Sequence, residues 1–470
     1  MPRNWIEFIT PDDIQLIHDT SMRLLDKVGV RFPESEAIAI FQEHGAKVEN
    51  QIVYLPERLV MEALGAAPAQ FILRARNPSR DITIGGGETL FAPAYGAPFV
   101  FDLQAGKRGA TLEDYHNLAR LAHALPNQDL SGHLMVEPGD APPQSAYLHM
   151  LHANMVHSDK PFIGSTQGAR GANHTLEMAA ILFGERPQEP VAIGVVNPLS
   201  PLGYSREMAA ALVAYARARQ PLIIATLVMA GSTGPVTLAG ALAQQNAELL
   251  AGVVLAQWIS PGAPVVYGST STNIDMRTGA LAIGGPELAL MVSAHAQLAR
   301  YYGLPSRAGG ALTDANSPDM QAGLESMFGL LTAVNSGIDF VLHAAGILSS
   351  YLAFSYEKFV LDDEMCGMLR RYRHGIQVTP ETLAYEVIAD VGPGGNFLTE
   401  EHTLERCRSE FWTPEIFERR GLDAWMGAGR LDAAARARQR WQALLHAHED
   451  PPLDKTTLRQ LNAYINEHSP

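Results

Sequence analysis

Short apolar runs alternate with amphipathic stretches from about residue 95 onward. Each run fits a buried strand followed by a loop and a helix, and we count eight of them: 98–102, 130–136, 162–165, 191–197, 222–228, 265–268, 306–308 and 338–343. Eight strands that alternate with helices through right-handed crossovers close most naturally into a (β/α)8 barrel. The pattern therefore predicts an α/β fold built on a TIM barrel, with its binding groups at the carboxyl ends of the strands.

An open, doubly wound sheet is the alternative to a barrel. Such a sheet needs a Gly-x-Gly-x-x-Gly turn after a strand and a ribose-binding acid further on, and no predicted strand is followed by this motif. The glycine run 85–87 opens no helix, so we interpret it as a turn rather than a phosphate loop. The barrel remains the favoured fold.

Two flanking segments do not repeat the strand-helix unit. Residues 1–91 mix a helical pattern at 12–28 with short strand-like pieces, which predicts an N-terminal α+β segment. We assign 92–375 to the barrel and 376–470 to a C-terminal extension of mixed helices packed on the barrel. Long helices of the outer layer are predicted at 236–258 and 287–301.

The stretch 306–345 reads as a strand, a loop, a helix and a second strand. Ser317 fits a helix N-cap with Pro318 at the first helical position. Apolar residues recur at steps of three and four and predict one buried helix face: Leu324, Met327, Phe328, Leu331 and Val334. Gly337 ends the helix, and the next apolar run ends in His343, which the barrel would place at its mouth.

Composition excludes several classes of protein. Of 470 residues, 47% are hydrophobic and 18% charged, with a formal net charge of -15, so a nucleic-acid partner is not expected. We identify no apolar run of about 20 residues and no basic leader followed by an apolar core, which predicts a cytoplasmic protein without a membrane partner. Cys366 and Cys407 are the only cysteines and are expected to be reduced.

The mouth of such a barrel would gather uncharged polar groups and aromatic rings. The polar residues expected there are Asp102, Glu137, Thr166, Gln167, Asn197, Thr226, Ser269, Thr270, Thr313, Asp314 and His343, and the aromatic residues are Tyr95, Tyr204, Tyr351 and Phe354. No His-Glu-x-x-His motif, strand-end lysine or Gly-x-Ser-x-Gly elbow is present. His149, His152 and His157 share one helical stretch, and since metal sites usually recruit several elements, we expect no metal.

Aromatic rings beside polar groups suit a quaternary ammonium ion. Ring faces attract the cation, and hydrogen-bond donors can hold a carboxylate at the other end of the same ligand. For each ring taken alone, plain core packing is the favoured interpretation.

Several stretches resemble the trimethylamine methyltransferase (MttB-like) family over nearly the whole chain. They are Met229-Ala-Gly-Ser-Thr-Gly-Pro-Val-Thr-Leu-Ala-Gly240, Gln244-Gln-Asn-Ala-Glu-Leu-Leu-Ala-Gly-Val-Val-Leu-Ala-Gln257, Pro264-Val-Val-Tyr-Gly-Ser269, Thr313-Asp-Ala and Gly394-Gly-Asn-Phe-Leu-Thr399. The resemblance implies a barrel that passes a methyl group from a methylated amine to the Co(I) centre of a separate corrinoid protein. Founding members carry pyrrolysine shortly after the match to Thr313-Asp-Ala, where this chain has Asn316, Ser317 and Pro318.

The chain thus resembles the pyrrolysine-lacking branch, whose known substrates are quaternary amines such as glycine betaine. Proline betaine, carnitine and dimethylsulfonio compounds are alternative donors, and a non-catalytic betaine-binding barrel is a further alternative. Asn197 and His343 resemble the carboxylate-holding residues of that branch, and we expect Tyr95, Tyr204, Phe354, Thr313 and Asp314 to line the same site. The corrinoid would belong to the partner, with no cofactor bound tightly by this chain. Barrels of this size often associate, so a homo-oligomer is expected.

Overall fold

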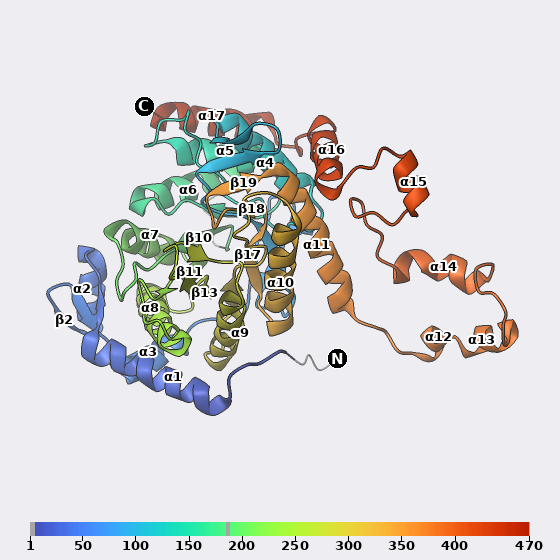
Figure 1. Ribbon diagram of the computed structural model, residues 1–470. Coiled ribbons are helices and arrows are strands. Elements are labelled where there is room, and N and C mark those ends of the chain that lie inside the picture. Colours follow the sequence, from blue (N-terminus) through green and yellow to red (C-terminus); the bar gives the residue numbers. More distant parts are fainter. Residues whose placement is uncertain (1–4, 185–188, 470) are drawn as a thin grey trace.

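A parallel sheet of seven strands forms the centre of the molecule, and the computed structural model describes residues 5–184 and 189–469. The strand order is β6-β17-β16-β13-β11-β10-β9, and helices cover its outer face (Figure 1). The strands are β6 (Leu90–Pro93), β9 (Phe162–Gly164), β10 (Ala192–Val196), β11 (Leu222–Thr226), β13 (Val265–Ser269), β16 (Ser306–Ala308) and β17 (Phe340–Ala345). The main helices are α4 (Leu112–Ala124), α5 (Ala146–His157), α6 (Gly168–Phe183), α7 (Arg206–Arg217), α8 (Leu238–Ile259), α9 (Pro286–Tyr301), α10 (Met320–Ser336) and α11 (Tyr356–His374).

Two of the eight predicted strands are absent from this sheet. The run 98–102 forms β7 (Phe99–Asp102), which belongs instead to a four-stranded sheet with β8 (Gly106–Gly109), β18 (Ile347–Leu348) and β19 (Ala353–Ser355). The run 130–136 forms no strand, because Gly132 adopts a φ of 87° that interrupts the extended backbone. The earlier run at β6 supplies the first strand of the parallel sheet.

Residues 129–132 nevertheless lie between the two edge strands of the sheet. Leu130 is fully buried in the same apolar cluster as the inner-face residues of the sheet. Three backbone hydrogen bonds connect the segment to β6 and to the start of β9: Asp129 N–H to Phe91 O (2.8 Å), Ser131 N–H to Pro161 O (3.0 Å) and Ile163 N–H to Gly132 O (3.3 Å). The sheet is therefore curled, and its edges are bridged by this irregular segment.

Large apolar side chains fill the inner face of the sheet. Along β10, Ile193 and Val195 belong to this inner cluster, whereas Ala192 and Val196 pack outward among the helices. Because such a strand is buried on both faces, its sequence is a continuous apolar run rather than an alternating one. For this reason, six of the eight apolar runs in the sequence correspond to strands of this sheet.

The position and buried face of α10 differ from the prediction. The helix begins at Met320 with Asp319 as its N-cap, whose side chain accepts from the Ala322 N–H, rather than at Pro318 after Ser317. Leu324 and Phe328 are 61% and 46% exposed. The residues that α10 buries are Ala322, Ser326, Leu330, Ala333, Val334 and Ser336. The predicted buried face was therefore wrong over the first half of the helix, since small residues rather than large ones pack there.

The apolar helix α8 corrects the statement that the chain has no apolar run of about 20 residues. Among the described residues it is the one helix long and apolar enough to cross a membrane by length and composition, with a mean hydropathy of 1.2 over an 18-residue window. The structure buries 83% of that window. A helix that is apolar all round is typical of a core position, and α8 packs between the sheet and the N-terminal segment.

Smaller elements surround the sheet at both chain ends. The N-terminal segment contains α1 (Pro11–Arg23), β1 (Val30–Arg31), α2 (Ser35–Glu43), β2 (Lys47–Glu49), β3 (Ile52–Tyr54), α3 (Glu57–Leu64), β4 (Phe71–Leu73) and β5 (Ile82–Ile84). A small separate sheet consists of β12 (Met229–Ala230), β14 (Thr272–Ile274) and β15 (Leu281–Ala282). In the chain, β12 follows β11, and β14 and β15 follow β13. The C-terminal helices are α12 (Pro380–Leu383), α13 (Tyr385–Val391), α14 (Glu401–Glu410), α15 (Leu422–Gly427), α16 (Ala433–His446) and α17 (Lys455–His468). Of these, α16 packs on α11 and α4, and α17 packs on α5 and α6.

Candidate functional site

Arg307 carries a positive charge into the interior near the mouth of the curled sheet. It lies in the middle of β16, and its neighbour Ala308 packs outward, so the alternation along the strand turns Arg307 to the inner face. The side chain is 3% exposed. Within the described chain its Nε–H has no hydrogen-bond partner, and Nη1 makes only a long bond of 3.4 Å to the Ser269 carbonyl. An anion would supply the missing partner of this buried guanidinium.

His343 lies in a bulge of β17, directly beside this charge. The pairing of β17 with β6 slips between Leu342 and Ala345, and His343 adopts a left-handed φ of 67°. Bulges of this kind redirect a side chain and are common next to functional sites. The Tyr95 N–H donates to His343 Nδ1 at 3.2 Å, so Nδ1 carries no proton and Nε2–H is the available donor. Burial and the nearby Arg307 hold the pKa of His343 well below 6.5, which keeps the ring neutral.

Tyr95 and Tyr351 are two aromatic residues that interact electrostatically with Arg307. The rings of Tyr351 and His343 meet edge to face at 4.9 Å between centroids. The Tyr351 hydroxyl makes no hydrogen bond of ordinary geometry, and Tyr351 also has a left-handed φ of 75°. Burial raises the pKa of both tyrosines to about 12, so both are neutral donors at physiological pH. We call Tyr95, Arg307, His343 and Tyr351 the mouth cluster.

Asn197 follows β10 at the carboxyl ends of the strands and is exposed there. Its amide Nδ2 donates to the Ala225 carbonyl at 2.6 Å, which fixes the side chain and leaves its Oδ1 and second N–H available. Thr166 lies after β9 and donates to the Val195 carbonyl at 2.9 Å. The solvent-exposed Asn197 and the partly exposed Tyr95 and Tyr351 connect the mouth cluster to the surface.

Thr313 and Asp314 hold loops together at the same end of the sheet. Thr313 Oγ1 donates to Glu325 at 2.6 Å, and Glu325 also accepts from the Asp314 N–H at 2.8 Å. The carboxylate of Asp314 accepts from the N–H groups of Ile283 and Gly284 and from the Ser350 hydroxyl. These oxygens are already used, which favours a role in positioning the Tyr351 loop over direct contact with a ligand.

Two other expected site residues lie in the apolar core. Tyr204 stacks on Phe32 at 4.5 Å between ring centroids, and its hydroxyl donates to the Glu248 carbonyl at 2.9 Å on the outer side of the sheet. Phe354 is fully buried against Phe359 at 5.1 Å and also packs on Gly346. Both positions correspond to the core-packing alternative, so neither enters the mouth cluster.

The charge at Arg307 was missed by the sequence analysis. Its signal was available, since a lone arginine inside the predicted strand 306–308 contradicts burial on both faces unless a ligand or partner needs it. The cluster now combines one fixed cation, three neutral donors and two aromatic rings. This arrangement can hold a small ligand with a carboxylate at Arg307 and a cationic group against the ring faces.

The three histidines of 149–157 do not converge on one point. His149 and His152 contact Ser469 and Asn462, respectively, on the C-terminal helix. His157 instead shares the Asp450 carboxylate with His448, at 2.6 Å and 2.9 Å, and its second ring nitrogen lies 2.8 Å from His116. The ligand atoms of His157, His448 and Asp450 lie within 4.8 Å of one another, but ordinary hydrogen bonds satisfy all three groups.

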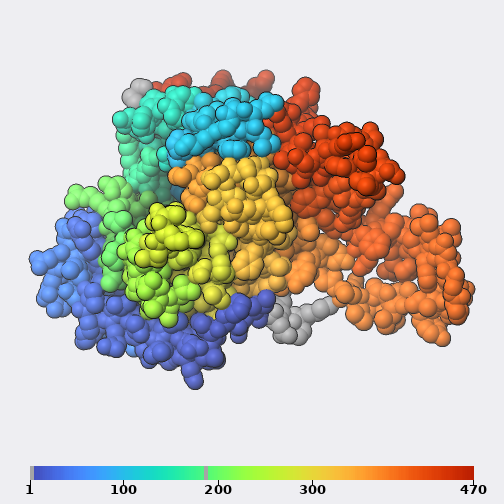
Figure 2. All heavy atoms as spheres, in the orientation of Figure 1, coloured from blue at the N-terminus to red at the C-terminus, as the bar shows by residue number. Residues whose placement is uncertain are grey.

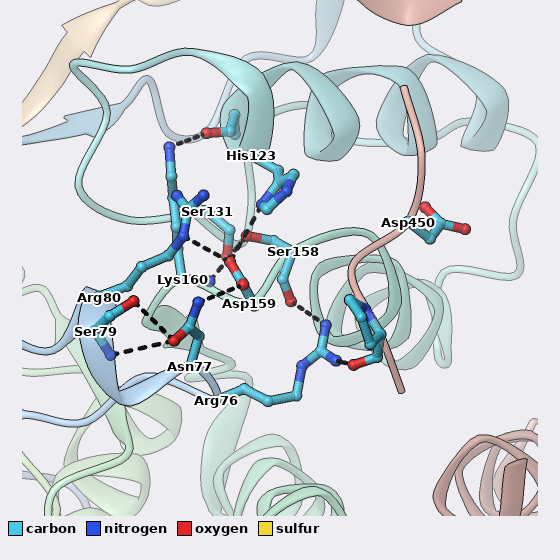
Figure 3. A network of polar contacts seen from close by, with 12 residues as sticks. Arg76, Asn77, Ser79, Arg80, His123, Ser131, Ser158, Asp159, Lys160 and Asp450 are labelled. Carbon is cyan, nitrogen blue, oxygen red and sulfur yellow. Dashed lines mark hydrogen bonds and ion pairs between the residues drawn. The ribbon is translucent and has the colours of Figure 1, made fainter. Parts of the chain in front are cut away.

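A second polar network lies at the opposite end of the sheet, before β9 (Figure 3). Asp159 pairs with Arg80 at 2.9 Å and accepts from Asn77 at 3.0 Å, while Arg76 donates to the Ser158 carbonyl. The Lys160 ammonium, whose pKa is lowered by burial, donates to two carbonyls at the end of α4. These groups bind one another, so the network has a structural role rather than a ligand-binding one.

A surface hollow of about 610 Å³ lies between α2, α6 and α7, away from the mouth. Of its charged residues, Glu36 and Arg217 are paired with each other, Glu34 accepts from the Ala37 N–H, and Arg219 donates to the Pro261 carbonyl. The hollow therefore offers no unsatisfied charge comparable to that of Arg307.

Comparison with known proteins gives one family and one fold. A family model for trimethylamine methyltransferase (MTTB) matches residues 2–469. A glycine betaine methyltransferase from Desulfitobacterium hafniense (strain Y51) is 48% identical over 97% of this chain and 96% of that protein. A proline betaine:corrinoid methyltransferase from Eubacterium limosum is 34% identical over 99% and 98%. The solved monomethylamine methyltransferase (MtmB) of Methanosarcina barkeri aligns with a TM-score of 0.51 over 93% of this chain and 95% of that one; at 14% identity this likeness concerns the fold alone.

Proposed function

Because this chain belongs to the trimethylamine methyltransferase (MTTB) family, we propose that it transfers a methyl group from glycine betaine to the Co(I) centre of a corrinoid protein. The 48% identical relative is named a glycine betaine methyltransferase, and more distant relatives are named for proline betaine and L-carnitine. The observation that carries the proposal is the buried, carboxylate-free guanidinium of Arg307 beside two tyrosine rings. A betaine supplies both the missing anion and a cation for the rings.

In this mechanism the protein orients the methyl donor. The betaine carboxylate binds Arg307 with donors from His343 and Tyr351, and the Asn197 amide contributes at the rim. The ammonium group then points toward the open end, where one N–CH3 bond breaks. Its electron pair stays on nitrogen, so dimethylglycine leaves as a neutral amine, and the methyl group forms a bond to cobalt, which becomes methyl-Co(III). No residue has to protonate the leaving group, and alignment in a dry site is the main contribution.

Trimethylamine is a less suitable donor for this mouth. It lacks the carboxylate that Arg307 requires, and as a neutral amine it has to be activated before it can lose a methyl group. The residues Asn316, Ser317 and Pro318 offer no electrophilic group for that activation. Proline betaine and carnitine carry both a carboxylate and a quaternary ammonium, so they remain alternative donors.

We propose that the corrinoid protein binds the loops that surround the mouth. Large apolar side chains are exposed in several of these strand-to-helix connections or at the start of the following helix: Leu199, Val236, Met276, Met320 and Leu352. Exposed apolar residues grouped around a reactive site are typical of a protein contact surface. Cobalt has to approach the bound methyl group closely, so the partner has to cover this face.

The closure of the barrel is a further part of this proposal. We propose that residues 129–132 complete a (β/α)8 barrel, because they are hydrogen-bonded to both edges of the curled sheet. The divisions 1–91, 92–375 and 376–470, the cytoplasmic location and the absence of a cofactor bound tightly by this chain stay predictions.

Reconstitution tests the function directly. The purified chain is mixed with a reduced Co(I) corrinoid protein and one candidate donor, and formation of methyl-Co(III) is followed by absorbance. We expect rapid methylation with glycine betaine and none with trimethylamine. Robust methylation from trimethylamine would contradict the proposed donor, and binding of betaine without any methylation would favour a non-catalytic binding barrel.

A further inference from the structure

Part of the C-terminal extension is folded without a core of its own. We call residues 376–411 the C-terminal arm; it contains α12, α13 and α14. All residues of this stretch are described, and none of them is buried. Figures 1 and 2 show the arm in orange, projecting from the body of the molecule. Nine of its large apolar side chains are exposed: Ile376, Val378, Leu383, Tyr385, Ile388, Phe397, Leu398, Leu404 and Phe411.

The two ends of the arm meet at α11. Arg371 Nη1 donates to the Gly375 carbonyl at 2.9 Å, and Nε and Nη2 donate to the Glu410 carbonyl and carboxylate at 2.9 Å and 3.0 Å. The arm is thus a loop with a fixed base. Its helices have 4, 7 and 10 residues, and helices this short are marginal in water without tertiary packing. Monomeric soluble proteins rarely expose so many large apolar side chains within one segment, so we expect the covering surface to come from another molecule.

We propose that the C-terminal arm is the contact surface of a homodimer, in which a second copy of this chain covers it. The body offers a matching surface on α10, next to α11, where Leu324 and Phe328 are exposed although their spacing predicts burial. If each of the nine side chains loses on the order of 100 Å² of accessible surface, two arms bury roughly 1,800 Å², and the covering surface adds to this, which reaches the range of stable homodimers. A two-fold axis makes both contacts equivalent.

A corrinoid protein fits the arm less well than a second copy. Such a partner has to reach the mouth, whereas α11 leads away from β19 to the opposite end of the sheet. There the Arg373 guanidinium covers the Trp5 ring at 4.6 Å, and Trp5 lies against Gly337, which precedes β17. The arm therefore begins at the end remote from the mouth.

A membrane surface is also a poor occupant. The arm carries seven carboxylates and two arginines, a net charge of 2 − 7 = −5. This charge opposes binding to anionic lipids. The contact surface is inferred from the exposed side chains alone and does not depend on the proposed reaction.

Sedimentation velocity of the full chain tests the proposal. We expect the wild-type protein to be a dimer, or an assembly of dimers, at micromolar concentration. The double variant Leu398→Glu/Leu404→Glu should dissociate to monomers, with the dimer dissociation constant raised at least about a hundredfold, because it places two charges in the apolar contact on each copy. The matched control Leu16→Glu/Ile72→Glu alters two exposed apolar residues of the N-terminal segment and should leave the assembly unchanged.

A monomeric wild-type protein, or a double variant that assembles as tightly as wild type, would overturn the proposal. Hydrogen exchange on the unmodified chain provides the second measurement, which is needed if the variant fails to fold. Amides of α13 and α14 should be protected at high protein concentration and lose at least about tenfold of that protection on dilution below the dissociation constant. Protection that does not change while the protein sediments as a monomer at both concentrations would also overturn it.

Discussion

The residues at the mouth fall into two sets: those with unused hydrogen-bond donors, which can face a ligand, and those that hold neighbouring loops in place. His343, Tyr351 and Arg307 retain unused donors, whereas Thr313 and Asp314 have used their oxygens on neighbouring loops. The sequence suggested His343, Tyr95 and Tyr351 from their positions next to predicted strands, and these three lie together. It could not separate Tyr204 and Phe354 from them, because a ring beside a strand end has the same sequence context whether it points into the mouth or into the core. The substrate-binding roles stay predictions.

Replacing Asn197 or His343 by alanine should raise the KM for betaine about tenfold to a hundredfold. Hydrogen bonds to a charged group contribute roughly 1.5 to 3 kcal/mol each, which corresponds to that change in affinity. Steady-state kinetics and thermal unfolding are measured on the same variants. An unchanged KM with a lowered Tm for His343→Ala would assign this histidine a purely structural role.

The pH dependence of betaine binding should follow Arg307. Burial lowers the pKa of Arg307 to about 10, and the guanidinium is charged below that value and neutral above it. The pKa of His343 lies well below 6.5 and those of Tyr95 and Tyr351 are raised to about 12, so none of them titrates between pH 6.5 and 9. We expect a constant dissociation constant over that range and an increase above about pH 10. Calorimetric titration measures the dissociation constant at each pH, and circular dichroism verifies that the protein stays folded. A change in affinity near pH 7 would contradict the prediction.

At the scale of elements, burial on both faces made most strands visible in the sequence. The run 98–102 was misassigned because β7 is a short apolar strand like those of the central sheet, although it is only partly buried and pairs in the four-stranded sheet. The segment 130–136 was misassigned because Gly132 bends an apolar stretch without removing it from the interior. The prediction of the buried face of α10 was wrong over the first half of the helix. Residue spacing identifies an apolar stripe on a helix, but it does not show whether the rest of the same chain covers that stripe.

Methyl acceptor binding should depend on the loops around the mouth. Met276→Glu places a charge on an exposed apolar residue between β14 and β15. We expect the KM for the corrinoid protein to rise at least about tenfold, because a buried, unpaired charge at a contact surface costs more than about 1.4 kcal/mol. The KM for betaine should stay the same. Met61→Glu on α3 is the matched control, and equal effects of the two substitutions would argue against the proposed docking face.

At the scale of the whole molecule, the family resemblance is confirmed, and the curled parallel sheet fits the barrel that the sequence predicted. The sequence predicts a homo-oligomer, but a contact surface could not be located from spacing, because the exposed residues of the C-terminal arm have the same apolar pattern as a buried extension. The sequence located the apolar run 130–136 but could not show that it stays irregular, since its hydrogen bonds connect residues far apart in the chain.

Methyl transfer should survive removal of divalent metals from the methyltransferase. His157, His448 and Asp450 form the closest group of potential ligands in the described chain, and hydrogen bonds already satisfy them at a site remote from the mouth. After dialysis of the protein against EDTA, the rate of betaine-dependent cobalt methylation should be unchanged. A loss of rate that zinc restores would identify this group as a metal site.

The unpartnered charge of Arg307 means that the free protein is less stable than its fold permits. An isolated charge in a desolvated interior is a thermodynamic burden that only the missing anion relieves. Arg307→Met should therefore melt at a higher temperature than the ligand-free wild type while losing affinity for betaine, whereas betaine itself should raise the Tm of the wild type in proportion to the logarithm of its concentration. Differential scanning calorimetry measures both effects. The substrate would then act as a folding cofactor of its own enzyme, and cells rich in betaine would hold more of the enzyme in its folded form.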